Sequence, residues 1–199
     1  MILIIAALKA ELLPLIKHYN ITQKQNVENG ALYAGGNIHL LRTGIGIQSA
    51  GKVLTTYLKS YKPDKIMDIG AAGALTDKLD KGSIRQVTSI LNKANQKLVI
   101  KPLLPDRQAY ENAVLFTSSK PVLDGALREQ LSMKYRAEMV DMEAFTLAEI
   151  SAKANIPFHC IKIISDHADH DTVHDFQTNI GILSDTLCGL IIEFLDNAI

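Results

Sequence analysis

The chain has 199 residues, of which 47% are hydrophobic, 21% are charged, 12 are glycine and 6 are proline. This composition excludes a disordered or collagen-like chain, and the length predicts one buried core. Because 21 Lys and Arg residues balance 21 Asp and Glu residues, the chain lacks the surplus positive charge typical of proteins that bind nucleic acids or membrane surfaces, and a small-molecule partner is favoured.

Short β-branched runs alternate along the chain with longer amphipathic ones. This alternation is typical of strands connected through helices, so it predicts a three-layer α/β/α sandwich with a mixed, mostly parallel sheet. In the first part of the chain we expect strands at 1–6, 31–34, 38–42 and 65–69 and helices at 8–18 and 47–61. The turn signal Asn29-Gly30 precedes two of these strands, which form a hairpin. Pro14 predicts a late start or a kink in the first helix.

The middle of the chain gives a weaker signal than its ends. Residues 99–100 and 114–116 look like strands, while Pro102 and Pro105 predict irregular backbone between them. In the last third we expect helices at 121–131, 142–154 and 175–195 and strands at 137–140 and 158–164. No repeat or linker interrupts the pattern, so we expect one domain over residues 1–199.

Cysteine usage and the N-terminus bear on the compartment. Cys160 and Cys188 lie in apolar stretches and form no CxxC pair, which argues against a disulfide framework or a zinc site and fits a reducing environment. Residues 1–8 are apolar, but no basic segment precedes them, and no apolar run reaches the roughly 18 residues of a membrane span. We therefore expect a cytoplasmic protein that binds neither nucleic acid nor membranes.

Two glycine-rich segments follow predicted strands. The first, RTGIGIQSAGKV, begins at Arg42 and leads into a helix, where free N–H groups and the helix dipole suit an anion or polar ligand. It fits GxxxxGK through Lys52, but Val53 replaces the hydroxyl that binds magnesium, so a nucleotide-triphosphate loop is a minor alternative, as is a tight turn without a ligand. The second, 70–75, consists of small residues at the expected carboxyl edge of the sheet, where ligands of α/β folds bind.

Three acidic residues follow the carboxyl ends of predicted strands: Glu11, Glu143 and Asp166. Each has a plain structural explanation, since Glu11 and Glu143 complement helix dipoles and Asp166 is suited to capping a turn. Their joint occurrence with two glycine-rich segments favours the alternative that all three converge on one cleft.

Five segments of the sequence carry a family resemblance. They are 7–11 (ALKAE), 43–46 (TGIG), 70–75 (GAAGAL), 140–144 (VDMEA) and 164–169 (ISDHAD). In order and spacing they resemble the purine nucleoside phosphorylase and nucleosidase superfamily, and within it the methylthioadenosine/S-adenosylhomocysteine nucleosidases. The resemblance spans nearly the whole chain, although the chain is shorter than such nucleosidases between Val87 and Phe116. Lys162 stands where relatives commonly have arginine, and Ala71 where they often have serine.

This resemblance implies hydrolysis of the N-glycosidic bond of a purine-type nucleoside without a metal or organic cofactor. Bond cleavage builds an oxocarbenium-like ribose, so it needs an acid at the base and negative or hydroxyl-binding groups at the sugar. Asp166 resembles the acid at purine N7, a role that requires burial. Glu11 resembles the base that orients the attacking water, and Glu143 resembles the carboxylate that holds the ribose hydroxyls.

The resemblance also implies residues that bind the substrate without reacting. Met142 is expected to pack against the sugar, and Gly73 and Ser165 belong to the motifs that contact the substrate. Ile45 and Phe176 are expected to line an apolar pocket beyond C5′, with ordinary core packing as the alternative for both.

Other functions stay open at this stage. Phosphorolysis is the nearest alternative, because the same fold uses phosphate in place of water and Arg42 is available as a cation. A futalosine-type hydrolase and a non-catalytic nucleoside-binding homologue are further alternatives. The last helix is apolar over a broad arc, and part of it or of the helix after Gly46 is expected to form the interface of a homodimer.

Three histidines alternate with aspartates in the densest polar cluster of the chain. The members are His167, Asp169, His170, Asp171, His174 and Asp175. A metal site and a mobile polar loop over the active site are the two interpretations. We favour the loop, because Asp is a common cap where a loop enters a helix.

Overall fold

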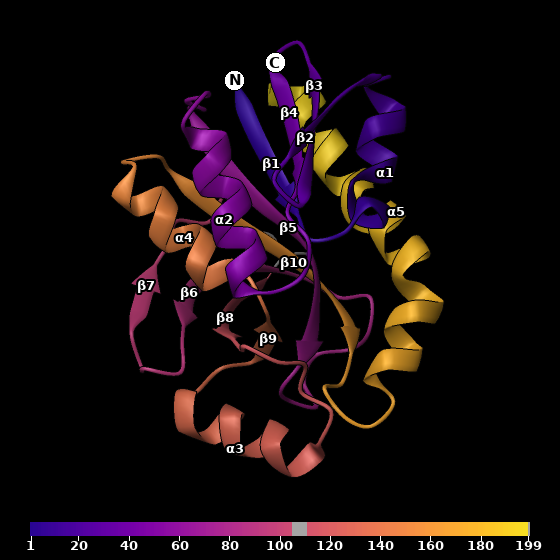
Figure 1. Ribbon diagram of the computed structural model, residues 1–199. Coiled ribbons are helices and arrows are strands. Elements are labelled where there is room, and N and C mark those ends of the chain that lie inside the picture. Colours follow the sequence, from indigo (N-terminus) through magenta and orange to yellow (C-terminus); the bar gives the residue numbers. More distant parts are fainter. Residues whose placement is uncertain (105–110, 199) are drawn as a thin grey trace.

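The computed structural model describes residues 1–104 and 111–198 and shows a mixed sheet between two pairs of helices (Figure 1). The strands are β1 (Ile2–Ala6), β2 (Gln23–Val27), β3 (Gly30–Gly35), β4 (Ile38–Arg42), β5 (Lys65–Ala74), β6 (Ile84–Leu91), β7 (Lys97–Val99), β8 (Glu111–Thr117), β9 (Met139–Asp141) and β10 (Phe158–Asp166). The helices are α1 (Lys9–His18), α2 (Ile47–Leu58), α3 (Gly125–Tyr135), α4 (Ala144–Lys153) and α5 (Thr172–Ala198).

The centre of the sheet is parallel. β1 lies between β4 and β5, and β10 pairs with the other edge of β5. The hairpins β2–β3 and β3–β4 extend this centre in antiparallel fashion. The strands described belong to one sheet, so the mixed α/β architecture predicted from the sequence is confirmed.

Beyond β5 the sheet closes on itself. β5 pairs with β9, β9 with β8, β8 with β6 and β6 with β10, and β10 returns to β5. We call these five strands the closed ring. Closure removes free strand edges, and it brings β5, β9 and β10, which are distant in sequence, into contact with one another.

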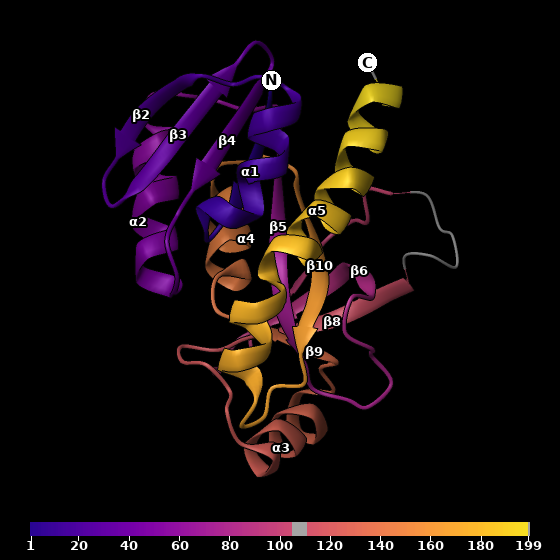
Figure 2. The ribbon, with the colours of Figure 1, turned by 90° about the vertical axis from the view of Figure 1, so that its right-hand side faces the viewer.

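Helices cover both faces of the sheet, as Figures 1 and 2 show. Successive side chains of β1 point to opposite faces, so Leu3 and Ile5 join the core under α2 and α4 while Ile4 packs in the core under α1 and α5. Burial on both faces explains the continuous Ile and Leu run of β1. α3 lies at the end of the molecule away from the two termini (Figure 2).

Several element boundaries differ from the expectation. The late start predicted from Pro14 is wrong, because α1 begins at Lys9, where the Glu11 side chain accepts the N–H of Leu8. Residues 70–74, expected to follow the strand at 65–69, continue β5 instead, since their small side chains allow close pairing with β10 and β9.

The remaining differences concern helix starts and missed strands. α3 begins at Gly125 because Asp124 caps it, accepting the N–H groups of the second and third residues that follow Asp124. The sequence missed β2, whose residues are mostly polar and exposed, and β6, which pairs with the distant strands β10 and β8 as well as with the neighbouring β7. Pro105 lies outside the described residues.

By length and composition alone, α5 is long and apolar enough to cross a membrane. In the structure its residues Leu187, Cys188 and Ile191 are fully or almost fully buried in the core that α5 shares with α1 and β10. A core helix of a folded protein passes the same test of length and composition, so α5 is weak evidence for a membrane span.

Candidate active site

One pocket gathers the residues that the sequence singled out. Its volume is about 370 Å³, and β5, β9 and β10 meet there with the starts of α1, α2, α4 and α5. All eight predicted site residues line it: Glu11, Ile45, Gly73, Met142, Glu143, Ser165, Asp166 and Phe176. The expected convergence of the three carboxylates on one cleft is therefore confirmed.

Glu11 enters the pocket from the first turn of α1. Its Oε2 accepts the N–H of Leu8 at 2.8 Å, and its Oε1 accepts the N–H of Ala71 in β5 at 3.0 Å. Burial raises the pKa of Glu11, while these two backbone bonds oppose the increase. A buried carboxylate held at both oxygens has a fixed direction, which suits a group that must orient a small reactant.

The approach of Glu11 to β5 requires a glycine. Gly70 has φ of +143°, and a Cβ at this position would lie 2.6 Å from Oε1 of Glu11. Gly73 plays a similar part on the same strand, since a Cβ there would lie 2.9 Å from Oδ1 of Asp166. The small residues of β5 therefore leave room for two carboxylates at its backbone.

Asp166 is the last residue of β10 and is 4% exposed. Its Oδ2 accepts the Ser165 hydroxyl at 2.6 Å, and its Oδ1 accepts the Ala168 N–H and the Thr172 hydroxyl, both at 2.9 Å. The burial that an acid role requires is present, and three donors fix the carboxylate. Thr172 was not predicted from the sequence, although a hydroxyl at a helix start soon after the ISD motif is a usable signal.

Glu143 is the N-cap residue of α4 and reaches the start of α2. Its Oε1 accepts the N–H of Gly46 at 2.6 Å. Burial, followed by the charge of Asp141, raises the pKa of Glu143 to about 8. The third carboxylate thus faces the pocket with one oxygen already bonded and with a strong tendency to hold a proton.

The hydrogen bond between Glu143 and the Gly46 N–H argues against the nucleotide-triphosphate alternative. The Gly46 N–H at the start of α2, which a phosphate would need, is taken by a carboxylate of the protein itself. Lys52 points elsewhere, because it is 64% exposed and pairs with Glu28 at 3.0 Å.

Glu11 and Asp166 contact the same strand, β5, at positions two residues apart. Glu11 bonds to Ala71, and Asp166 lies against Gly73. Two residues of extended strand span about 7 Å. The two carboxylates therefore contact the β5 backbone at points about this far apart.

The rim of the pocket is apolar. Ile45 is 56% exposed and Val173 is 51% exposed, and both line the pocket. The core-packing alternative for Ile45 is therefore wrong. Phe176 and Met142 are half-buried and also face the pocket, so an apolar ligand group would have contacts on several sides.

Cationic side chains have little access to the pocket. Arg42 does not line it and donates to the backbone oxygen of Asn29 at 3.1 Å. Lys120, which the sequence analysis did not assign, is the cationic residue among the described residues that line the pocket. Lys162 is 3% exposed and is bound by buried aspartates instead.

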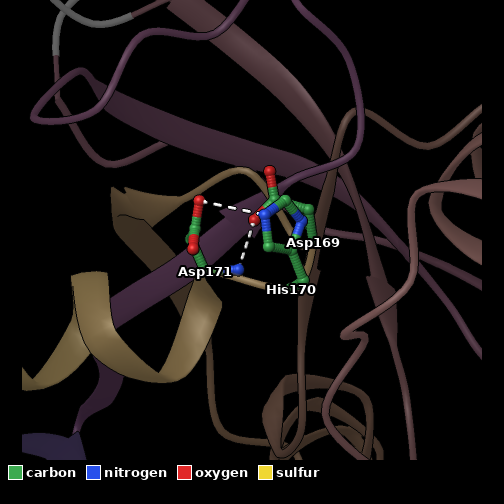
Figure 3. A group of neighbouring side chains, drawn as sticks. All are labelled: Asp169, His170 and Asp171. Carbon is green, nitrogen blue, oxygen red and sulfur yellow. Dashed lines mark hydrogen bonds and ion pairs between the residues drawn. The ribbon is translucent and has the colours of Figure 1, made fainter.

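The polar turn between β10 and α5 lies beside the pocket. Asp169, His170 and Asp171 bring ligand atoms within 4.8 Å of one another (Figure 3). His170 and Asp171 are exposed, and Asp169 accepts the N–H of Asp171 at 3.0 Å, as in an ordinary turn. His167 and His174 are not part of this group, so the arrangement gives no support to a metal site built from the histidines.

The amino-acid sequence is similar to those of known proteins. The chain matches the family described as "Phosphorylase superfamily" over residues 1–133 and again over 108–196. It is 29% identical to the 5'-methylthioadenosine/S-adenosylhomocysteine nucleosidase of Buchnera aphidicola subsp. Baizongia pistaciae, over 91% of this chain and 84% of that protein. The protein of the same name from Haemophilus ducreyi is 26% identical over 80% of both chains.

Solved structures show the same fold. The 5'-methylthioadenosine/S-adenosylhomocysteine nucleosidase of Helicobacter pylori, crystallised with butyl-thio-DADMe-Immucillin-A, matches with a TM-score of 0.88 at 16% identity, over 98% of this chain and 97% of that chain. The futalosine hydrolase of Helicobacter pylori matches over the same shares with a TM-score of 0.87 at 15% identity.

The close approach of Glu11 to Gly70 predicts a coupled effect on stability. Gly70→Ala is expected to lower the free energy of unfolding by about 3 kcal/mol, from backbone strain and the clash with Oε1. In a Glu11→Ala background the same change should cost about 1–2 kcal/mol less, because the clash is gone. Denaturant unfolding of the four proteins checks this. Gly181→Ala in α5, where a Cβ meets nothing, is the control, and equal costs in both backgrounds would contradict the geometry.

The raised pKa of Glu143 predicts how stability depends on pH. A carboxyl whose pKa rises from 4.5 to about 8 on folding contributes stability that is fully present below pH 4.5 and is lost as pH rises through 8. Between pH 5 and pH 9 this contribution should fall by about 2–4 kcal/mol. Urea unfolding at both pH values should therefore show a smaller loss for Glu143→Gln than for the wild type, and an equal loss would disprove the shift.

Proposed function

From the premise that the chain belongs to the phosphorylase superfamily, we propose that it hydrolyses the N-glycosidic bond of a purine-type nucleoside. The observation that carries the proposal is the meeting of three buried carboxylates, Glu11, Glu143 and Asp166, around one pocket. Relatives named 5'-methylthioadenosine/S-adenosylhomocysteine nucleosidase support the same reaction.

Asp166 acts on the leaving base. When the bond between C1′ and the base breaks, the electron pair moves to the base, and a proton or strong hydrogen bond at N7 stabilises the developing charge. The donors Ser165 and Thr172 hold the Asp166 carboxyl in one orientation, so the group is preorganised for the reaction.

Glu143 and Glu11 act on the sugar side. Since Oε1 of Glu143 accepts the Gly46 N–H, its Oε2 is left to hold a ribose hydroxyl. Glu11 receives a proton from the water whose oxygen attacks C1′, and free ribose leaves after the base. Negative charge on Glu11 also stabilises the oxocarbenium-like ribose.

The choice of water over phosphate follows from the charges around the pocket. Phosphate brings at least one negative charge next to the sugar, where Glu11 and Glu143 already lie, and Arg42 is directed elsewhere. Lys120 lies two residues from Val122, which packs with Val140 and Ala168 at the Asp166 end of the pocket. Lys120 is thus the one cation among the described lining residues, against two acidic groups at the sugar, which favours hydrolysis.

The identity of the base and of the 5′ group is a finer question. The apolar rim formed by Ile45, Val173 and Phe176 suits an apolar 5′ substituent. The fold resembles the methylthioadenosine/S-adenosylhomocysteine nucleosidase and the futalosine hydrolase almost equally, so it does not separate the two substrate classes. The homodimer and the cytoplasmic location stay predictions.

The acid role predicts the effect of Asp166→Asn. A panel of purine nucleosides assayed for free base should show release by the wild type and a fall in kcat of at least about 100-fold in the variant. Asp171→Asn, an exposed change in the same turn, should leave the rate near that of the wild type. Base release that continues undiminished in Asp166→Asn would refute the acid role, and nucleoside binding without any release would point to a non-catalytic protein.

The water mechanism predicts the sugar product. The wild type should form free ribose, with no ribose-1-phosphate, at the same rate with and without phosphate. Glu11→Gln should lower kcat by about 100-fold, whereas Glu149→Gln on the outer face of α4 should not. Chromatography of the sugar products decides the matter, since ribose-1-phosphate formed only when phosphate is present would identify a phosphorylase.

A further inference from the structure

A buried ion cluster lies behind the pocket. The Nζ atom of Lys162 is 2.8 Å from Oδ2 of Asp68 and 3.4 Å from Oδ2 of Asp141, and each of the three side chains is at most 3% exposed. Only Asp141 reaches the pocket wall, so Lys162 and Asp68 do not face a ligand there. Among residues 1–104 and 111–198, Lys162 is the one lysine or arginine that is buried. Both aspartates therefore depend on Lys162 for charge compensation.

The cluster joins three strands of the closed ring. Asp68 belongs to β5, Lys162 to β10 and Asp141 to β9. Further along β5, the N–H of Ala71 holds Glu11, and further along β10 the strand ends at Asp166. The Lys162 ammonium therefore fixes β5 three residues before Ala71, which holds Glu11, and fixes β10 four residues before Asp166.

Asp141 carries the connection to the third carboxylate. Its Oδ2 accepts the N–H of Ala144, and its Oδ1 accepts the hydroxyl of Thr117 at 2.7 Å. Ala144 begins α4, and Glu143 is the N-cap residue of that helix. Fixing Asp141 thus fixes the start of α4 and the direction from which Glu143 enters the pocket.

The cluster also has an unbalanced charge. Two aspartates share one ammonium, and the groups that face them are Glu11 from α1, Glu143 from α4 and the Cys160 thiol from β10. The charge of Asp68 raises the pKa values of Glu11 and Glu143, and the charge of Lys162 lowers both. Removing one charge or the other should therefore act on the site in opposite directions.

We propose that Asp68, Lys162 and Asp141 are positioning residues for the reaction, in which the Lys162 ammonium holds β5, β9 and β10 together and acts on Glu11 and Glu143 through the protein rather than by touching substrate. The inference rests on the proposed function. It differs from a merely structural salt bridge because it requires the charge, as well as the packing, of each member.

The first test does not require activity. The carboxyl carbon of Glu143 is titrated by NMR in protein labelled at glutamate, with the signal assigned by its loss in Glu143→Gln. Asp68→Asn should move the titration down by about 1 pH unit and Lys162→Met should move it up by about 1 unit. Lys162→Arg retains the charge and should leave it near the wild-type value.

A matched control separates charge from packing. Gln86 lies in β6 of the same closed ring, is 1% exposed and bonds to the backbone of Leu103 and Leu104, away from the carboxylates. Gln86→Leu should lower stability without moving the Glu143 titration. If Lys162→Met fails to fold, Asp68→Asn and Lys162→Arg still decide the outcome.

The second test uses turnover. Asp68→Asn should lower kcat by about tenfold at its own pH optimum, with little change in KM, and the acid limb of the pH profile should move downward. A titration unmoved in Asp68→Asn, or moved in the same direction by Asp68→Asn and Lys162→Met, would overturn the proposal. If the wild type releases no base, only the proposed function is contradicted. The NMR titration would still test the effect of the cluster's charge on Glu143.

Discussion

The site depends on the small-residue end of β5. Gly70 admits the carboxylate of Glu11 to within bonding distance of Ala71, and Gly73 leaves space for the carboxylate of Asp166 two residues further along. A side chain at either glycine would occupy the position of a carboxylate oxygen. Because the strand is held on both sides by β9 and β10, its backbone cannot move away, so the points at which the two acidic groups contact β5 are fixed by strand geometry.

Burial gives these carboxylates their chemical character. In the described part of the chain five acidic side chains are buried, with Lys162 as the one buried lysine or arginine: Glu11, Asp68, Asp141, Glu143 and Asp166. Burial, followed by the charges of neighbouring carboxylates, raises the pKa values of Glu11, Asp68 and Glu143, and the one ammonium does not offset both effects. A sugar that becomes cationic during bond cleavage supplies the missing positive charge, so the site is better matched to that state than to the neutral substrate.

The sequence predicted the site better than the fold around it. Residues at the carboxyl ends of parallel strands meet at one edge, so strand positions alone brought Glu11 and Asp166 together. The ring closure was not predicted, because the pairing of β6 with β10 and of β9 with β5 joins segments far apart in the chain and leaves no local pattern. Asp68 was not assigned for the same reason, since its partner Lys162 lies 94 positions away in the numbering.

The most direct test of the account is the source of the oxygen at C1′ of the released sugar. The reaction is run in water enriched in oxygen-18, and the sugar is reduced at once with borohydride to prevent exchange. The mass of the product is then measured by mass spectrometry. Unlabelled sugar kept in the same water and reduced in the same way is the exchange control. Attack by a water held at Glu11 predicts one labelled oxygen in the sugar beyond the exchange control. Sugar without label, or label absent because a phosphate ester forms instead, would contradict the hydrolytic arrangement of Glu11, Glu143 and Asp166.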